Sequence, residues 1–244
     1  ALVYNETSTG VTNRDLPKIG EMAEGFGQLL IVDAISVIAG DWLKVDDWKI
    51  DVCIAGSQKC LACPPGLAMV SVSERAYEAI ERNKSRPFYF DLLSCRKFAE
   101  KSETPFTPAI PLFYALDEAL AMLKEEGLEA RIARHRECAS AFYRALEAMG
   151  LEILPPEAVR SNTVVAVKIP EGAEDAKVRD LMKKKHGVLI AGGMGKLKGK
   201  IFRIGSMGIV TKEMVARTVR ALADALTETT GRRYDAEAAL SAMG

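Results

Sequence analysis

The first third of the chain alternates between short apolar runs and a helical pattern. Residues 1–4, 29–33 and 50–54 are apolar runs of strand length. Residues 15–27 place apolar side chains at helical spacing, and Gly25 and Gly27 mark the end of that segment. Strands that alternate with helices in this way predict an α/β fold.

The rest of the chain adds one more strand, several helices and a second group of strands. Residues 67–72 predict a strand, and Ser73 is placed to cap a helix that reaches Arg82. Residues 83–108 show no regular pattern. The later elements are predicted as helices over 110–127, 128–149, 173–186 and from 211 onward, and as strands over 163–169, 188–191 and 201–205. The polar tail from Thr227 is expected to fray.

The two longest predicted helices meet near Gly127. The first is amphipathic over 110–127, and the second ends at Gly150, a residue type that commonly stops a helix. We expect this junction to divide the chain into two domains. The first would cover residues 1–127, and the second would be a smaller α+β domain over residues 128–244.

Composition excludes several kinds of partner. Hydrophobic residues make up 48% and charged residues 27% of the 244 residues, as in ordinary globular proteins. The 33 Lys and Arg balance 33 Asp and Glu, so the basic excess that nucleic acid or an acidic membrane selects is missing. No apolar run reaches membrane-spanning length, and the five cysteines have contexts typical of reduced thiols. We therefore expect a cytoplasmic protein with no nucleic-acid and no membrane partner.

Lys59 stands in an unusual setting for a lysine. It follows the apolar run 50–54 and lies in a turn of small residues closed by Pro64, Pro65 and Gly66. A desolvated lysine has a lowered pKa, and its amine can form a Schiff base with a carbonyl group. The alternative is a surface lysine at a loop edge, which would be favoured if Lys59 stood alone.

Asp33 supplies a chemically matched partner for this lysine. It ends the apolar run 29–33, and in an α/β fold the ends of such strands face the ligand crevice. Pyridoxal phosphate requires a lysine to hold its aldehyde and an acid to keep its pyridine nitrogen protonated. An acid after a strand can instead cap a following helix. The two residues together favour the cofactor.

Cys60 and Cys63 form a C-x-x-C pair, which can indicate a redox or metal site. No second cysteine pair accompanies them, and the only histidines are His135 and His186, so we expect no metal. Pro64 also prevents the helix start that a redox pair needs. Both cysteines are therefore interpreted as packing residues. His135 lies between two arginines and is expected to be solvated and not catalytic.

Several motifs, in order and spacing, resemble the class V (fold type I) pyridoxal-phosphate-dependent aminotransferases. Within that family they are most similar to the alanine–glyoxylate, serine–glyoxylate and serine–pyruvate branch. The matching segments are 5–11, 32–36, 56–59 with 64–66, and 199–205. The resemblance implies a large-domain portion with a mostly parallel sheet, followed by the small α+β domain. It also implies that the family's large domain has a further N-terminal part, which this chain would lack.

The resemblance assigns roles to individual residues. Lys59 and Asp33 would be catalytic, and Arg203 would hold the substrate's α-carboxylate. An arginine between apolar neighbours is costly unless it meets an anion, and its guanidinium matches a carboxylate at two points. The residues expected to bind the cofactor are Ser8, Thr9, Asp33, Gln58, Lys59 and Thr107. Thr107 would do so across the interface of a homodimer with shared active sites.

The implied reaction moves an amino group from serine or alanine to glyoxylate or pyruvate through a Lys59 Schiff base. One alternative is a lyase of the cysteine-desulfurase type. Such enzymes usually place a histidine before the lysine, whereas this chain has Gln58 there. The other alternative is a truncated chain without independent activity, since the family's phosphate-cradling turn would precede residue 1.

Overall fold

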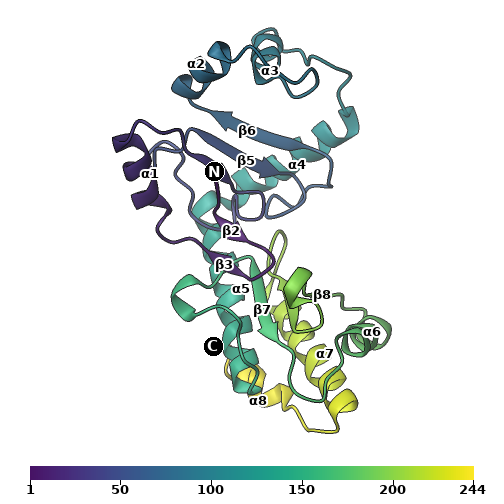
Figure 1. The fold of residues 1–244 in the computed structure, drawn as a ribbon. Helices are drawn as coiled ribbons and strands as arrows, with labels where there is room; N and C mark the ends of the chain where they lie inside the picture. The colour runs from purple at the N-terminus through teal and green to yellow at the C-terminus, as the bar shows by residue number, and fades with distance from the viewer.

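The computed structural model describes residues 1–244, which form an upper and a lower lobe joined by long helices (Figure 1). The upper lobe holds a four-stranded sheet in the order β1–β4–β5–β6. Its strands are β1 (Leu2–Val3), β4 (Ile31–Asp33), β5 (Val52–Gly56) and β6 (Ala68–Val72). The first three run parallel, and β6 runs antiparallel to β5. This sheet and its helices confirm the predicted α/β fold class.

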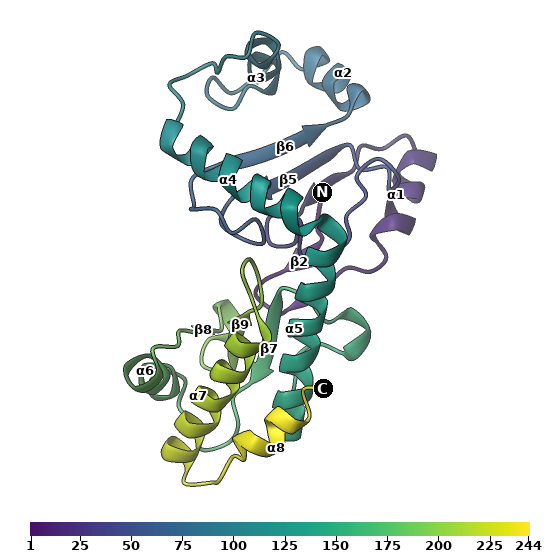
Figure 2. The same ribbon diagram turned by 180° about the vertical axis from the view of Figure 1, so that it is seen from behind.

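Four helices surround or extend the upper sheet. They are α1 (Leu16–Gly25), α2 (Glu74–Arg82), α3 (Leu92–Ala99) and α4 (Ile110–Glu126). The side chain of Ser73 accepts a hydrogen bond from the backbone of Ala76, so it caps α2 as predicted. Seen from behind, α4 crosses one face of the sheet (Figure 2). None of the helices combines the length and the apolar character needed to cross a bilayer.

The prediction that residues 83–108 are irregular is wrong in its middle, where α3 forms. Asp91 caps this helix by accepting a hydrogen bond from the backbone of Leu93. No residue of α3 is fully buried, although most of its side chains are half-buried, so the helix contributes little to a core. The cap was a local signal for it.

The lower lobe packs helices on a three-stranded antiparallel sheet in the order β7–β9–β8. The strands are β7 (Val164–Lys168), β8 (Ala191–Gly192) and β9 (Ile201–Gly205), and two short 3-10 segments are η1 (Glu157–Val159) and η2 (Gly195–Leu197). The helices are α5 (Leu128–Ala148), α6 (Asp175–His186), α7 (Lys212–Thr230) and α8 (Ala236–Ser241). The strand predicted over 188–191 thus forms only at its end. We propose the domain boundary, residues 1–127 against 128–244, at the junction of α4 and α5.

The larger hydrophobic core lies in the lower lobe. It joins 27 buried residues from α5, α7, α8 and the sheet, whereas the main cluster of the upper lobe has eight. The polar tail takes part in this core, so the expected fraying from Thr227 is wrong. Tyr234, Ala239 and Met243 are buried, and Asp235 caps α8 by accepting from two backbone amides.

A short hairpin connects the two lobes. It consists of β2 (Asn5–Glu6) and β3 (Val11–Thr12), and it reaches from the upper sheet toward β7 (Figure 1). The buried amide of Asn5 donates to the hydroxyl of Ser36 at 2.8 Å and to that of Thr163 at 3.1 Å. The backbone of Ser161 donates to the carbonyl of Gly10 at 3.0 Å. Buried hydrogen bonds of this kind fix one lobe against the other.

Replacing Gly10 with alanine is expected to destabilise the fold by on the order of 1–3 kcal/mol. An added Cβ would lie 2.8 Å from the carbonyl oxygen of Val164, and the φ of +70° disfavours any residue with a Cβ. Thermal unfolding should show a Tm lowered by about 2–10 °C. Gly25→Ala is the matched control, because nothing lies near its added Cβ and alanine favours a helix. Equal Tm values for the two variants would contradict the close contact.

Candidate active site

Three parallel strands end at the same edge of the upper sheet. Val3 of β1 is paired with Asp33 of β4, and Asp33 is paired with Ile54 of β5. The chain then continues from β1 into the β2–β3 hairpin and from β5 into the turn with Lys59. The carboxyl ends of parallel strands are where α/β proteins bind ligands, so this edge is the candidate site.

The lysine turn, residues 57–63, is held at both ends and in its middle. The backbone of Cys63 donates to the carbonyl of Ser57 at 3.1 Å, and the Ser57 hydroxyl donates to the carbonyl of Pro64 at 2.7 Å. The thiol of Cys60 lies 3.4 Å from the carbonyl oxygen of Ser36, beyond the end of β4. These contacts fix the backbone that carries Lys59.

The amine of Lys59 is left free by this arrangement. The side chain is half-buried, and its Nζ makes no hydrogen bond or ion pair within the chain. A lysine that is partly withdrawn from water and lacks a carboxylate partner is available as a nucleophile. Both neighbouring cysteines are buried free thiols, as expected for packing residues. Burial raises the pKa of the Cys60 thiol to about 12, which leaves it unreactive.

Asp33 turns back on its own backbone instead of capping a helix. Its Oδ1 accepts a hydrogen bond from the backbone of Ile35 at 2.9 Å, and no helix begins there. The helix-cap alternative is therefore wrong. The second carboxylate oxygen makes no hydrogen bond within the chain and remains available to a ligand.

Arg203 lies beside the turn that carries Ser8 and Thr9. Its Nε donates to the carbonyl of Gly192 at 2.8 Å, and its Nη1 donates to the carbonyl of Thr7 at 3.1 Å. The first bond lies within the lower sheet, and the second joins that sheet to the hairpin loop of the upper lobe. Nη2 has no partner in the chain. The neighbouring Glu6 has a lowered pKa because its carboxylate accepts from the backbone of Ser8 and, to a lesser extent, because it faces Arg203.

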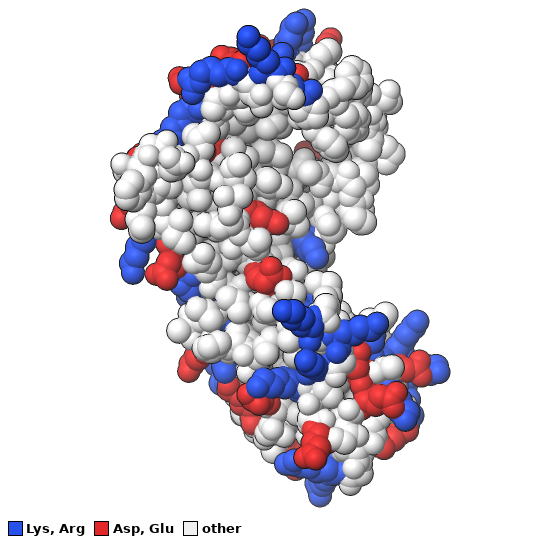
Figure 3. Space-filling model, viewed as in Figure 1, with Lys and Arg blue, Asp and Glu red and all other residues white.

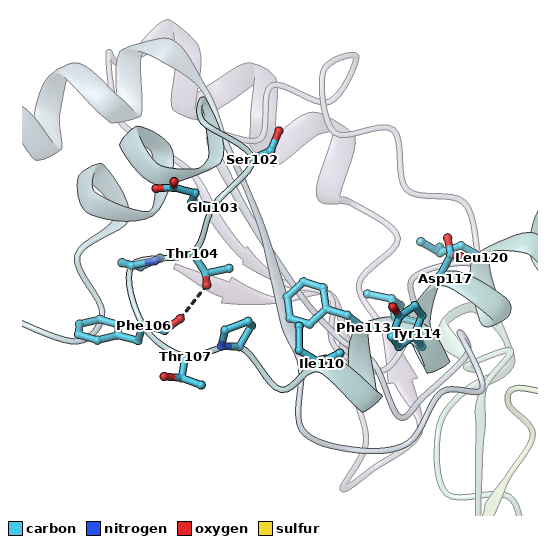
Figure 4. A pocket seen from close by; sticks show the side chains of 13 residues that line it. Ser102, Glu103, Thr104, Phe106, Thr107, Ile110, Phe113, Tyr114, Asp117 and Leu120 are labelled. Carbon is cyan, nitrogen blue, oxygen red and sulfur yellow. Dashed lines mark hydrogen bonds between the residues drawn. The ribbon is translucent and has the colours of Figure 1, made fainter.

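Gln58 and Thr107 are placed differently from the other predicted residues. Gln58 stands in the lysine turn, but its side chain is exposed. Thr107 is also exposed and lies in a separate surface pocket of about 1200 Å³ between the loop 102–108 and α4 (Figure 4). No hydrogen bond links Thr107 to Lys59, Asp33 or Arg203.

His135 is the residue most clearly misjudged from the sequence. It is fully buried, and its Nδ1 lies 2.8 Å from the carbonyl oxygen of Arg131. Its Nε2 accepts a hydrogen bond from the backbone of Gly208 at 3.0 Å. The flanking arginines suggested a solvated face, yet Ile132 and Ala139 at helical spacing place His135 on the buried stripe of α5. That periodicity was the signal that could have found it.

The buried His135 predicts a stability that falls with acid. Burial lowers the pKa of His135 below 6.5, and the charges of Arg134 and Arg131 also lower it, whereas the hydrogen bond to the Arg131 carbonyl and the charge of Glu126 act in the opposite sense. His135 therefore binds a proton in the unfolded chain at a pH at which it stays neutral in the folded chain. The contribution to stability is complete above about pH 6.5 and is lost as the pH falls toward the folded-state pKa, by up to about 1.4 kcal/mol per pH unit. Urea unfolding between about pH 7.5 and 5 should show a shallower loss in His135→Gln than in the native chain; equal slopes would contradict this.

Comparisons with known proteins show which family the chain resembles as a whole. The family profile described as "Aminotransferase class-V" matches residues 1–207. An uncharacterized aminotransferase of Methanocaldococcus jannaschii is 47% identical over 93% of this chain and 59% of its own length. A serine–glyoxylate aminotransferase of Arabidopsis thaliana is 38% identical over 86% of this chain and 53% of its own. The crystal structure of the ureidoglycine–glyoxylate aminotransferase of Bacillus subtilis superimposes with a TM-score of 0.92 and 37% identity, covering 99% of this chain and 63% of that one. The chain thus spans roughly three fifths of these relatives' lengths.

Proposed function

We propose, from the premise that this chain belongs to the class-V aminotransferase family, that it takes part in a pyridoxal-phosphate-dependent amino-group transfer. The observation that carries the proposal is the free amine of Lys59 at the sheet edge where Asp33 ends its strand. A cysteine-desulfurase-like lyase is the less favoured alternative. Its structural likeness, at 16% identity, concerns the fold alone, and the lysine here follows Gln58.

The side chains at this edge fit the chemistry of that cofactor. An aldehyde requires an unpaired amine, a pyridine nitrogen requires an acid with a free oxygen, and a ring hydroxyl requires small polar partners. Lys59 supplies the first, Asp33 the second, and the half-buried Ser8 and Thr9 the third. Pyridoxal phosphate, when bound, supplies the carbonyl that takes up the amino group and the ring that accepts electrons from the substrate's α-carbon.

Each residue at this edge has a separate proposed role in the reaction. Lys59 would hold the cofactor through Nζ and, once released, move a proton from the substrate's α-carbon and return it later. Asp33 would keep the ring nitrogen protonated. Gln58 would help to position the cofactor. Its side chain is exposed and would have to turn toward the cofactor to do so.

Arg203 would bind the α-carboxylate of the substrate. Its Nε and Nη1 are held by two backbone carbonyls, so Nη2 is the group left to donate to an anion. The substrate proposed is serine or alanine as amino donor, with glyoxylate or pyruvate as acceptor. Relatives described as serine–glyoxylate and alanine–glyoxylate aminotransferases support this choice.

Replacing Arg203 with glutamine is expected to raise KM for the amino acid by about 10–100-fold with a smaller effect on kcat. A hydrogen bond to a charged group contributes about 1.5–3 kcal/mol, and here it is made in the ground state as well as in the transition state. Steady-state kinetics with alanine or serine as the varied donor would measure it. The matched control is Arg232→Gln, an exposed arginine at the far end of the lower lobe. A fall in kcat with unchanged KM would contradict the assignment.

Thr107 is proposed to reach the cofactor phosphate of a partner subunit in a homodimer. The pocket around it is lined by apolar side chains that a monomer leaves exposed, among them Ile110 at 51% and Tyr114 at 74%. The surface at the upper right of Figure 3 carries few charged side chains. A partner covering it would bury these side chains and bring Thr107 to a shared site.

Covalent trapping tests the proposed function directly. The purified protein would be incubated with pyridoxal phosphate, reduced with borohydride, digested and analysed by mass spectrometry. We expect the label on the peptide that contains Lys59, and glycine formation when alanine and glyoxylate are then offered to unreduced protein. A label spread over exposed lysines such as Lys18, with Lys59 unmodified, would overturn the proposal.

A further inference from the structure

Two side chains of helix α5 form hydrogen bonds with Gly208, in the loop that follows β9. His135 accepts from the backbone N–H of Gly208 at 3.0 Å, and the adjacent Arg134 donates to the carbonyl oxygen of the same residue at 3.0 Å. Arg134 also donates to the carbonyl of Val210 at 2.8 Å. Both polar backbone groups of Gly208 are thus satisfied by two consecutive side chains.

The protonation state of His135 follows from its two contacts. Nε2 faces an N–H group and must therefore be the unprotonated acceptor. Nδ1 faces a carbonyl oxygen of Arg131 at 2.8 Å and must carry the proton. The charged groups around the ring are Arg131 and Arg134 on its own helix and Glu126 at the end of α4. The Cys60 thiol of the lysine turn faces Arg134. A second proton on the ring would place two donors against each other.

Gly208 in turn lies directly against the lysine turn. A Cβ added to it would stand 3.4 Å from the carbonyl oxygen of Lys59 and 3.3 Å from the Cβ of Ala62. The φ of Gly208 is +75°, a conformation that glycine adopts without strain. The residue is therefore the spacer between the His135 ring and the backbone that carries Lys59.

We propose that His135 is a positioning residue for Lys59: its neutral ring fixes Gly208, and Gly208 fixes the backbone of the lysine turn. The proposal rests on the proposed function for the meaning of Lys59, while the contact chain itself stands on this geometry. The two ring nitrogens of His135 contact the backbone of Arg131 and Gly208 and not the Lys59 amine. The ring acts through one backbone residue, so its loss would alter the presentation of the Lys59 amine without removing a reacting group.

Three histidine variants separate positioning from general destabilisation. His135→Leu keeps the bulk but removes the nitrogen acceptor of the Gly208 N–H and leaves only the Cys60 sulfur near it, whereas His135→Gln retains an acceptor near the position of Nε2. His186→Leu is the matched control, since His186 lies at the end of α6 in the lower lobe and pairs with Asp224. The first readout is the hydrogen-exchange rate of the Gly208 amide. The second is the rate of reductive methylation of the Lys59 amine by formaldehyde, relative to that of the exposed Lys18 amine. Neither readout requires the cofactor.

We expect His135→Leu to raise exchange at Gly208 and to lower the methylation rate of Lys59 about tenfold, because a buried donor that loses its acceptor destabilises the backbone around it. His135→Gln should restore most of both, and His186→Leu should change neither. Equal Lys59 rates in the native chain and in a folded His135→Leu variant would overturn the proposal, as would a loss that glutamine does not restore. The outcome is separable from that of the proposed function, which fails if native Lys59 is never labelled by pyridoxal phosphate.

Discussion

Replacing Lys59 with alanine is expected to abolish covalent capture of pyridoxal phosphate and to lower amino-group transfer by at least about 10²–10⁴-fold. That range is what the loss of a general acid–base group costs, and Lys59 would also be the only covalent tether of the cofactor. The fold should survive, because the lysine turn is held by the backbone and by Ser57 and Cys60, and the Lys59 amine contributes no hydrogen bond. The measurement is glycine formation from glyoxylate, together with retention of cofactor after desalting.

The control for this prediction is Lys18→Ala. Lys18 lies on α1 with its side chain 80% exposed and forms a long ion pair with Asp15. It should keep both activity and cofactor, since an exposed pair of this kind contributes little. If both Lys59→Ala and Lys18→Ala kept their activity, the reaction centre would lie elsewhere in the chain.

Replacing Phe142 with alanine is expected to lower the free energy of unfolding by about 3–5 kcal/mol. Phe142 is 2% exposed in the middle of α5 and belongs to the core that also contains Phe202, which precedes Arg203 on β9. Removing the ring leaves a cavity that helices on both sides cannot fill by small shifts. This loss is a large part of the 5–15 kcal/mol by which typical proteins are stable.

Urea unfolding followed by circular dichroism would measure the effect of Phe142→Ala. Phe26→Ala is the matched control, because Phe26 is 77% exposed after the end of α1 and its removal should cost less than about 0.5 kcal/mol. A similar midpoint for both variants would show that the cluster around α5 is not the main core. Because β9 lies in this core, a partly unfolded Phe142→Ala should also bind the amino acid donor poorly.

Local sequence patterns were sufficient for most elements of the fold. Strand-length apolar runs placed β1, β4, β5 and β6, and caps such as Ser73 and Thr211 marked the starts of α2 and α7. These signals work because the side-chain period of a strand or helix and the cap of a helix are set within a few residues. The prediction failed at α3 and α8, where the caps Asp91 and Asp235 were local signals that went unused.

The sequence by itself therefore determined the α/β order, the lysine turn and the chemical types at the site, because residue identity and spacing carry that information. The tertiary structure alone decided which of them meet. Arg203 reaches Thr7 across 196 positions of sequence, and His135 reaches Gly208 across 73. Contacts at such separations depend on how the hairpin, β9 and α5 pack on one another. The same packing turned a histidine between two arginines inward, since burial on a helix follows its face and not its immediate neighbours.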